Sequence, residues 1–235
     1  MIRRLVLFDI DGTLLLSGGA GRRAILAAVT DEAGIGPDHV EKVRFDGKTD
    51  PQIVVELFEA AGHAERPGPE RIARVLDRYL YHLEHDLARF ADRATVMPGV
   101  EPLLESLGSD DRIVVGLLTG NVTRGAMLKL KAVNIRSDQF RVGAYGSDHS
   151  LRSELPAIAV DRARPIFGRV PTGGEIVIIG DTPADVTCGR GVGARSIGVA
   201  TGSFSTAHLA SAGADHVFAD LSDTMAVHAT IIGTL

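Results

Sequence analysis

The chain has 235 residues, of which 45% are hydrophobic, and its formal net charge is −5. This length allows one large domain or two small ones, and the apolar content is enough for a packed core. The negative charge argues against a nucleic-acid partner, which favours a basic face. The single cysteine, Cys188, cannot form an internal disulfide, so a reducing compartment is expected.

The N-terminal segment does not have the pattern of a secretory signal. Arg3 and Arg4 precede an apolar run that stops at Asp9, which is too early for a signal peptide. The sequence contains no apolar stretch long enough to span a bilayer. We therefore expect a cytoplasmic protein, monomeric or homodimeric, that binds neither membranes nor nucleic acid.

The apolar run at residues 5–8 ends in two aspartates one residue apart, Asp9 and Asp11. Alternate side chains of an extended segment share a face, so these carboxylates begin as neighbours. Neighbouring carboxylates resist joint ionisation unless a cation or a proton lies between them. Because Mg²⁺ takes oxygen ligands, the stretch is best explained as a strand that delivers two carboxylates to a metal.

Two other interpretations of this stretch are available. Asp11 followed by Gly12 between apolar runs is also a β-hairpin signal. A calcium loop starting at Asp9 would need Gly at its sixth position and Glu at its twelfth, where the chain has Leu14 and Ala20. The calcium reading is therefore weaker, and the hairpin reading depends on what the rest of the chain supplies.

Residues 17–93 predict a small all-helical insert without a strand. Apolar stripes at helical spacing occupy three segments, about 22–33, 51–61 and 70–87. Asp50 is the expected N-cap of the second helix, with Pro51 as its first residue.

Two motif-like patterns within the insert carry little weight. Residues 19–24 match the dinucleotide pattern G-x-G-x-x-G/A, but the strand before them already ends at Asp9. His82 and His85 lack the H-E-x-x-H zinc spacing, so they favour a solvated helix face.

From residue 94 onward, apolar strands alternate with helices. The pattern predicts strands at 113–118, 140–143, 175–179, 195–199 and 216–218, and helices at 101–107, 123–132, 156–167 and 208–212. This alternation is typical of an α/β fold with a doubly wound parallel sheet. We expect residues 1–16 and 94–235 to form that domain.

Polar side chains follow three of the expected strands where each strand ends. They are Asp9 and Asp11, Thr119 and Asn121, and Asp181 and Asp185. Ligands of open α/β sheets bind at the carboxyl ends of the strands. Carboxylates there suit a divalent cation, and a hydroxyl with backbone amides suits an oxyanion, so the sequence predicts a Mg²⁺-dependent phosphate site. An aspartate can attack phosphorus, while a second carboxyl transfers protons.

These segments resemble motifs of the haloacid dehalogenase superfamily. The similar stretches are residues 8–14 (FDIDGTL), 119–121 (TGN) and 180–185 (GDTPAD). The helical insert is similar to the C1-type cap of the phosphoglycolate phosphatase and β-phosphoglucomutase branch. The resemblance implies a Rossmann-like core with residues 17–93 as its cap.

The resemblance also implies a role for each residue. Asp9 would be the nucleophile and a metal ligand, and Asp11 the general acid/base with its backbone carbonyl on the metal. Asp181 would bind the metal, and Asp185 would reach it through water or orient a basic residue. Thr119, with the amide of Gly120 or Asn121, would bind the phosphoryl oxygens.

The third motif departs from the family pattern, which usually offers a Lys. No Lys follows Lys131, and the candidate cations are Arg152, Arg162 and Arg164. Arg152 stands just before a helix, where the Lys would fall, and its planar fork suits phosphate. Arg162 and Arg164 lie within that helix and are expected to be solvated.

The cap offers further cations for an anionic substrate. Lys48 lies in a polar loop, and Arg22 or Arg23 follows the glycine-rich connector, although all three are equally compatible with an exposed surface.

The acid at Asp11 favours an oxygen leaving group within the superfamily, hence a phosphate ester. The expected function is a Mg²⁺-dependent phosphatase for a small phosphorylated metabolite, such as a phosphoglycolate-like acid or a sugar phosphate. The alternatives are a phosphosugar mutase of the β-phosphoglucomutase type and a non-catalytic phosphate-binding module.

Overall fold

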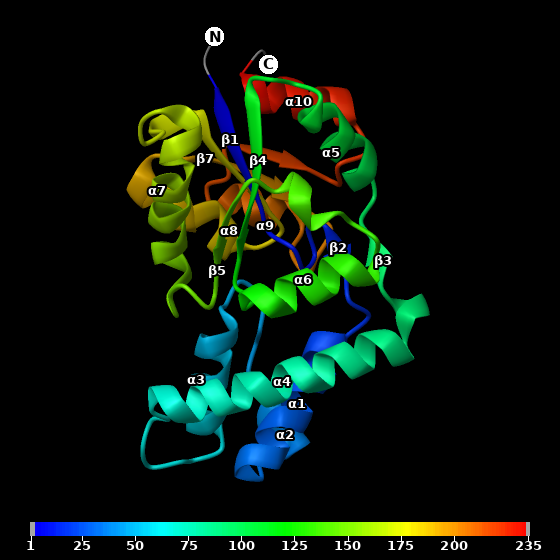
Figure 1. The fold of residues 1–235 in the computed structure, drawn as a ribbon, viewed down its shortest axis with the longest axis vertical. Helices are drawn as coiled ribbons and strands as arrows, with labels where there is room; N and C mark the ends of the chain where they lie inside the picture. The colour runs from blue at the N-terminus through cyan, green and yellow to red at the C-terminus, as the bar shows by residue number, and fades with distance from the viewer. Residues whose placement is uncertain (1–2, 234–235) are drawn as a thin grey trace.

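A computed structural model describes residues 3–233 of the chain. Its main sheet has six parallel strands in the order β5-β4-β1-β6-β7-β8 (Figure 1). The strands are β1 (Arg4–Phe8), β4 (Ile113–Thr119), β5 (Val142–Tyr145), β6 (Ile176–Gly180), β7 (Arg195–Val199) and β8 (His216–Phe218). The expected α/β fold with a parallel sheet is therefore confirmed.

The first strand of the chain, β1, lies in the middle of this sheet. Val6 of β1 pairs with Val115 of β4 on one side and with Val177 of β6 on the other. Helices cover both faces, which explains why the central strands are apolar throughout. The helices are α5 (Val100–Gly108), α6 (Thr123–Ala132), α7 (Leu155–Phe167), α8 (Pro183–Cys188), α9 (Thr206–Ser211) and α10 (Thr224–Ile232).

Two hydrophobic clusters hold these helices to the sheet. Leu103 of α5, Ala126 of α6 and Val227 of α10 belong to the cluster on one face. Ala159 of α7 and Cys188 of α8 belong to the cluster on the other. The carboxyl ends of β1, β4 and β6 stay uncovered by these packed layers, which leaves their polar tips available.

The four α-helices within residues 17–94 form a separate group, at the lower end of Figure 1. They are α1 (Ala20–Ala33), α2 (Pro37–Val40), α3 (Asp50–Ala60) and α4 (Pro69–Arg89). A third hydrophobic cluster fills their interior, and Val122, which precedes α6, joins it from the sheet side. These helices therefore have a core of their own that abuts the carboxyl edge of the sheet.

The two chain crossings between the sheet and the helical group lie side by side. β2 (Leu15–Leu16) pairs antiparallel with β3 (Thr95–Val96). Gly18 follows β2 with φ of 58°, and an added Cβ would lie 2.6 Å from the Arg93 carbonyl oxygen. This close approach of the two connections requires glycine.

Short 3₁₀ helices complete the structure. They are η1 (Ala91–Arg93), η2 (Ser137–Gln139), η3 (Arg152–Glu154), η4 (Gly173–Glu175) and η5 (Gly189–Val192). Within residues 3–233, no helix combines the length and apolarity needed to cross a membrane.

Two local expectations are wrong in detail. The strand expected at 140–143 begins at Val142, because Phe140 ends a 3₁₀ turn instead of pairing in the sheet. The N-cap of α3 is Thr49, whose hydroxyl accepts a hydrogen bond from the Gln52 amide, and Asp50 is the first helical residue. Asp50 is displaced from the cap position because its carboxylate binds a backbone amide of the sheet domain.

Candidate active site

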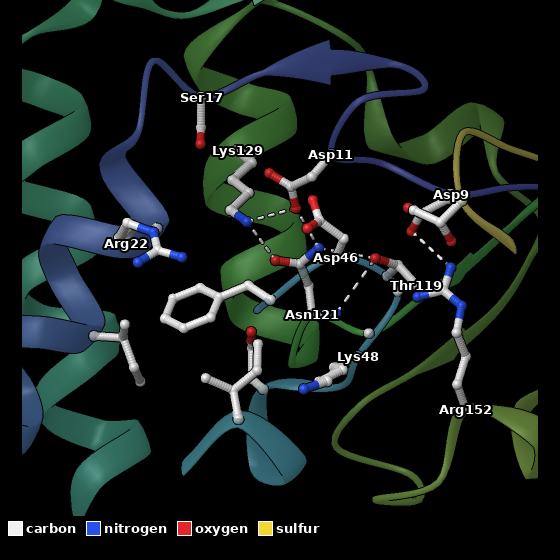
Figure 2. A pocket seen from close by; sticks show the side chains of 18 of the residues that line it. Asp9, Asp11, Ser17, Arg22, Asp46, Lys48, Thr119, Asn121, Lys129 and Arg152 are labelled. Carbon is white, nitrogen blue, oxygen red and sulfur yellow. Dashed lines mark hydrogen bonds and ion pairs between the residues drawn. The ribbon is translucent and has the colours of Figure 1, made fainter. Parts of the chain in front are cut away.

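A cavity of about 270 Å³ lies where the carboxyl ends of the strands face the helical group. The sheet side contributes the tips of β1 and β4, and the helical group contributes residues of α1, α4 and the loop before α3 (Figure 2). Residues on its wall include Asp9, Asp11, Thr119, Asn121, Lys129, Arg152, Asp181, Arg22, Phe45, Lys48, Asp50 and Tyr79. The cavity is thus built by both parts of the chain.

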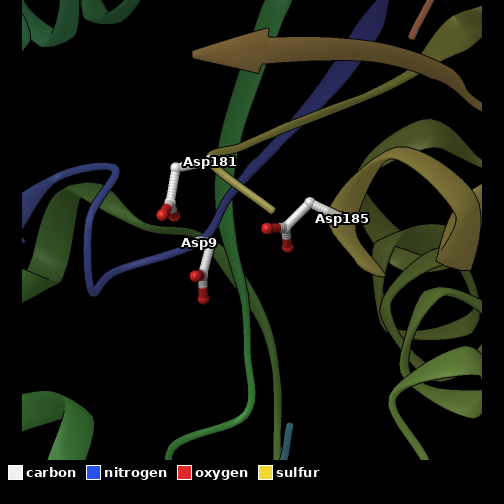
Figure 3. Close-up of side chains that lie close together, drawn as sticks. All are labelled: Asp9, Asp181 and Asp185. Carbon is white, nitrogen blue, oxygen red and sulfur yellow. The ribbon is translucent and has the colours of Figure 1, made fainter. Parts of the chain in front are cut away.

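Three aspartates converge on the sheet side of this site (Figure 3). A carboxylate oxygen from each of Asp9, Asp181 and Asp185 lies within 4.8 Å of the other two. The three residues are no more than 6% exposed. The carboxylate of Asp11 lies outside this cluster, so of the four expected metal-binding residues the structure groups three side chains.

Burial is the main influence on the pKa values of Asp9 and Asp181. It raises the pKa of Asp9, an effect that Arg152 opposes and the neighbouring carboxylates reinforce. It also raises the pKa of Asp181, with repulsion from Asp185 and Asp9 adding to the shift. A divalent cation among the three oxygens would remove this repulsion, and carboxylate oxygens are the ligands that Mg²⁺ or Ca²⁺ prefers.

Arg152 places its guanidinium group beside the aspartate cluster. Its Nη2 lies 3.1 Å from Asp9 Oδ1 and also donates to Asp185 Oδ1. The side chain is 7% exposed, and its Nε has no hydrogen-bond partner among the described residues. Arg152 therefore presents a buried positive charge beside Asp9, at the place where the sequence comparison with the family expects a Lys.

Asp185 is fixed by the start of α8 as well as by Arg152. Its Oδ2 accepts hydrogen bonds from the Thr182 amide at 3.0 Å and from the Thr182 hydroxyl at 2.6 Å, and the Thr182 hydroxyl caps the Asp185 amide in return. This capping box accounts for one oxygen of the carboxylate. The other oxygen accepts a hydrogen bond from Arg152, and the expected role of Asp185 in orienting a basic residue stays a prediction.

The tip of β4 forms the second wall of the site. The Thr119 hydroxyl accepts from the Asn121 backbone amide at 3.3 Å and from Asn121 Nδ2 at 2.8 Å. An added Cβ at Gly120 would lie 2.0 Å from the Lys48 carbonyl oxygen, so glycine is required where the loop before α3 approaches. Thr119, Gly120 and Asn121 thus line the cavity together, and their expected role in binding a phosphoryl group stays a prediction.

The same loop is hydrogen-bonded to the β4 tip. The Asp50 amide donates to the Gly120 carbonyl at 2.8 Å, and Asp50 Oδ2 accepts from the Val122 amide at 2.8 Å. The Thr49 hydroxyl donates to the Ser150 carbonyl at 2.6 Å. The first two bonds join the helical group to the β4 tip that carries Thr119 and Asn121, and the third joins it to the loop after β5.

The three cations expected from the helical group have different positions and partners in the structure. Lys48 lines the cavity but pairs with Glu56. Arg22 also lines it, and its guanidinium lies 4.3 Å from the centre of the Phe45 ring. Arg23 is instead bound to Asp86 at 2.6 Å.

Three other polar side chains considered in the sequence lie outside the site. Arg162 and Arg164 form exposed ion pairs with Asp148 and Asp161, as expected for solvated arginines. His82 contacts Asp31 on the surface of α4, and the described residues show no metal-binding group there.

Comparisons with known proteins agree on one family. Residues 156–224 match a family model described as HAD-hydrolase-like. A phosphoglycolate phosphatase of Chromobacterium violaceum is 28% identical over 208 residues, which cover 85% of this chain and 86% of that protein. A hydrolase from Pseudomonas syringae has a similar structure, with a TM-score of 0.74, 23% identity, and coverage of 97% of this chain and 99% of that one.

A second solved structure is similar along the whole chain. It is a putative β-phosphoglucomutase from Bacteroides vulgatus, with a TM-score of 0.73, 20% identity, and coverage of 100% of this chain and 90% of that one. Part of the chain thus matches a haloacid dehalogenase-like model, and the curated relatives that cover most of it are named phosphoglycolate phosphatases. The resemblance found in the sequence motifs is confirmed.

Sequence reasoning missed two buried residues that contact site residues. The Thr13 hydroxyl donates to Asp181 Oδ1 at 3.0 Å, and Lys129 of α6 contacts Asp11 and Asn121 at 2.6 Å each. A signal for Lys129 was present, since it follows Gly125 and Ala126 by four and three residues and so shares their buried helix face.

Proposed function

We propose that this chain is a Mg²⁺-dependent phosphatase that hydrolyses a small phosphorylated metabolite through an aspartyl-phosphate at Asp9. The observation that carries the proposal is the meeting of Asp9, Asp181 and Asp185 beside one cavity whose other wall holds Thr119 and Asn121. The relatives named phosphoglycolate phosphatase support this reaction class. A phosphoglycolate-like acid and a sugar phosphate are the two substrate types we expect.

The three clustered carboxylates suit the proposed metal. They supply only hard oxygen donors, and Arg152 provides one positive charge against three buried acids. We propose Asp9, Asp181 and Asp185, with the backbone carbonyl of Asp11, as the residues that hold Mg²⁺. When bound, the ion would offset negative charge on the phosphoryl oxygens.

In the proposed mechanism the side chains have distinct tasks. Asp9 attacks phosphorus as the bond to the leaving oxygen breaks, and Asp11 gives that oxygen a proton. Thr119, the amides of Gly120 and Asn121, and the Arg152 guanidinium bind the equatorial oxygens. Asp11 then takes a proton from the water that attacks phosphorus and releases phosphate from Asp9.

We propose that residues 17–93 are a cap over a core made of residues 1–16 and 94–235. The separate hydrophobic cluster of α1, α3 and α4 supports this division, and so does their contribution to the cavity wall. Closure of such a cap excludes bulk water from a phosphoenzyme. Lys48 and Arg22 are the proposed contacts for an anionic part of the substrate.

Asp9→Asn tests the nucleophile. We expect hydrolysis of an aryl phosphate to fall below one-thousandth of the wild-type rate, because an amide cannot form the acyl phosphate. The matched control is Asp161→Asn, which changes an exposed aspartate of α7 and should retain full activity. Substantial turnover by Asp9→Asn would refute the assignment.

The same assay tests the metal and the reaction type. EDTA should remove activity and Mg²⁺ should restore it, whereas activity that is indifferent to chelation contradicts the metal site. Release of inorganic phosphate from a panel of phosphorylated metabolites identifies a phosphatase. Isomerisation of a sugar phosphate without release indicates a mutase, and binding of vanadate without any turnover indicates a phosphate-binding module.

A further inference from the structure

Lys129 is the only buried lysine among residues 3–233, at 4% exposure. It extends from α6 into the cavity between the sheet and the helical group (Figure 2). Taking an ammonium group out of water is costly unless it is paired and hydrogen-bonded. Its contacts therefore indicate what the charge does there.

Lys129, Asn121 and Asp11 form a closed triangle of hydrogen bonds. Lys129 Nζ donates to Asp11 Oδ2 at 2.6 Å and to Asn121 Oδ1 at 2.6 Å. Asn121 Nδ2 donates to the same Asp11 Oδ2 at 2.8 Å. Each pair of side chains is joined directly, so none of the three can rotate without breaking two bonds.

The triangle distinguishes the two oxygens of Asp11. Oδ2 accepts two side-chain hydrogen bonds, whereas Oδ1 accepts none from the described residues. Asp11 lines the cavity together with Asp9, and its side chain is 39% exposed. The arrangement therefore leaves one oxygen of Asp11 free to exchange a proton with a group in the cavity.

The helical group shields Lys129 from water. A Cβ added at Gly21 of α1 would lie 3.5 Å from Lys129 Nζ and 3.9 Å from the hydroxyl of Tyr79 of α4. The small residue at position 21 thus lets α1 lie against the ammonium group. Lys129 is consequently enclosed between α6 on the sheet side and α1 and α4 on the other.

We propose that Lys129 is a positioning residue that holds Asp11 with Oδ1 toward the reacting oxygen. The inference rests on the proposed function. In the first step the phosphorus bond to the leaving oxygen breaks, a bond to Asp9 forms, and the proton of Asp11 Oδ1 passes to the leaving oxygen. In the second, water bonds to phosphorus, the bond to Asp9 breaks, and Oδ1 receives the water's proton. Lys129 keeps its protons throughout.

Two other roles for Lys129 fit the contacts less well. A substrate-binding lysine would keep its donors for the substrate, but two of the three N–H groups already bind protein oxygens. A side chain that only packs in the hydrophobic interior would need no charge, and Met would fit the same space. The proposal and these two roles predict different kinetics.

The test uses Lys129→Met and an activated ester, 2,4-dinitrophenyl phosphate. Its leaving group needs no proton, so formation of the phosphoenzyme should be unaffected, while its hydrolysis needs Asp11 as base. We expect a rapid burst of one dinitrophenolate per active site, followed by turnover about 10- to 100-fold slower than wild type. The matched control is Lys131→Met on the exposed side of α6, which should turn over like wild type.

The Lys129→Gln variant separates positioning from charge. Its amide can still donate to Asp11 Oδ2, so it should recover much of the turnover that Lys129→Met loses. Equal loss in both variants would overturn the proposal. Loss of the folded state in both, measured by circular dichroism, would make Lys129 a structural residue and also overturn it.

The remaining outcomes are equally decisive. Unchanged turnover in Lys129→Met, or a raised KM with unchanged kcat, would overturn the positioning role. Failure of the proposed function itself is distinct, because wild-type protein would then release no dinitrophenolate above the level of Asp9→Asn.

Discussion

Asp50 is a carboxylate of the helical group that binds the backbone of the sheet domain. Its Oδ2 accepts from the Val122 amide, and its own amide donates to the Gly120 carbonyl. Burial raises the pKa of Asp50 to about 6, although Lys129 and the Val122 hydrogen bond oppose the shift. The folded protein therefore holds a proton here more tightly than the unfolded chain does.

This difference predicts how stability changes with pH. Between pH 4 and pH 6 the folded state binds more protons than the unfolded state, so the Asp50 contribution falls as pH rises. In Asp50→Asn, whose amide oxygen can still accept from Val122, this contribution is absent. Relative to this variant, we expect wild type to lose about 1 to 2 kcal/mol of unfolding free energy from pH 4 to pH 7.

Urea unfolding at several pH values measures this difference. We expect this loss of unfolding free energy to be smaller than the roughly 3 kcal/mol that a fully buried group with the same pKa shift would show, because Asp50 is only partly buried. Asp161→Asn is the control, and its profile should follow that of wild type. Parallel profiles for wild type and Asp50→Asn would contradict the shift.

Residues whose role follows from a local pattern could be predicted from the sequence. Asp9 and Asp181 each end an apolar strand, and parallel strands bring their carboxyl ends to one edge. The buried place of Lys129 follows from its helix face, but its partners could not be identified in this way. Packing of α6 against the tips of β1 and β4 brings Lys129 to Asp11 and Asn121, and no spacing along the chain records that contact. The capping role of Thr49 likewise depends on the contact of Asp50 with the Val122 amide.

At the scale of elements, α4 packs the helical group together. Leu83 is fully buried in its hydrophobic cluster, whereas Tyr81 on the same helix is 59% exposed. We expect Leu83→Ala to cost about 2–5 kcal/mol of unfolding free energy, because it leaves a cavity among packed side chains. Tyr81→Ala should stay within about 0.5 kcal/mol of wild type.

Hydrogen exchange locates the effect of Leu83→Ala. Because α1–α4 have their own hydrophobic cluster, their amides should exchange faster in the variant while those of β1 and β4 keep their protection. Uniformly faster exchange across the sheet would show that the two parts unfold as one unit.

At the scale of the whole molecule, the paired connections set how the helical group sits on the sheet. Gly18 has φ of 58° and no room for a Cβ beside Arg93. We expect Gly18→Ala to lower stability by about 1–2 kcal/mol, the cost of a left-handed conformation for Ala, and to displace one connection. The displacement should raise KM for the substrate, since it tilts the cavity wall.

The control for Gly18→Ala is Gly108→Ala at the end of α5. An added Cβ there meets nothing within 4 Å, so the substitution should be neutral or slightly stabilising. Thermal unfolding and steady-state kinetics of both variants measure the contrast. An unchanged KM in Gly18→Ala would show that this connection does not govern the cavity.

Because β2 pairs antiparallel with β3, the strand register of the main sheet does not depend on the length of the segment between these two short strands. The polypeptide leaves at Leu16 and returns at Thr95 in the neighbouring strand, so the register of β1 and β4 places no demand on the intervening length. The pairing therefore fixes only how far apart the two ends of the insert lie, and a segment of another length could join them without changing the register of β1 and β4. Under the proposed function, the insert that would select the substrate could then differ in length while the aspartates at the carboxyl edge keep their places.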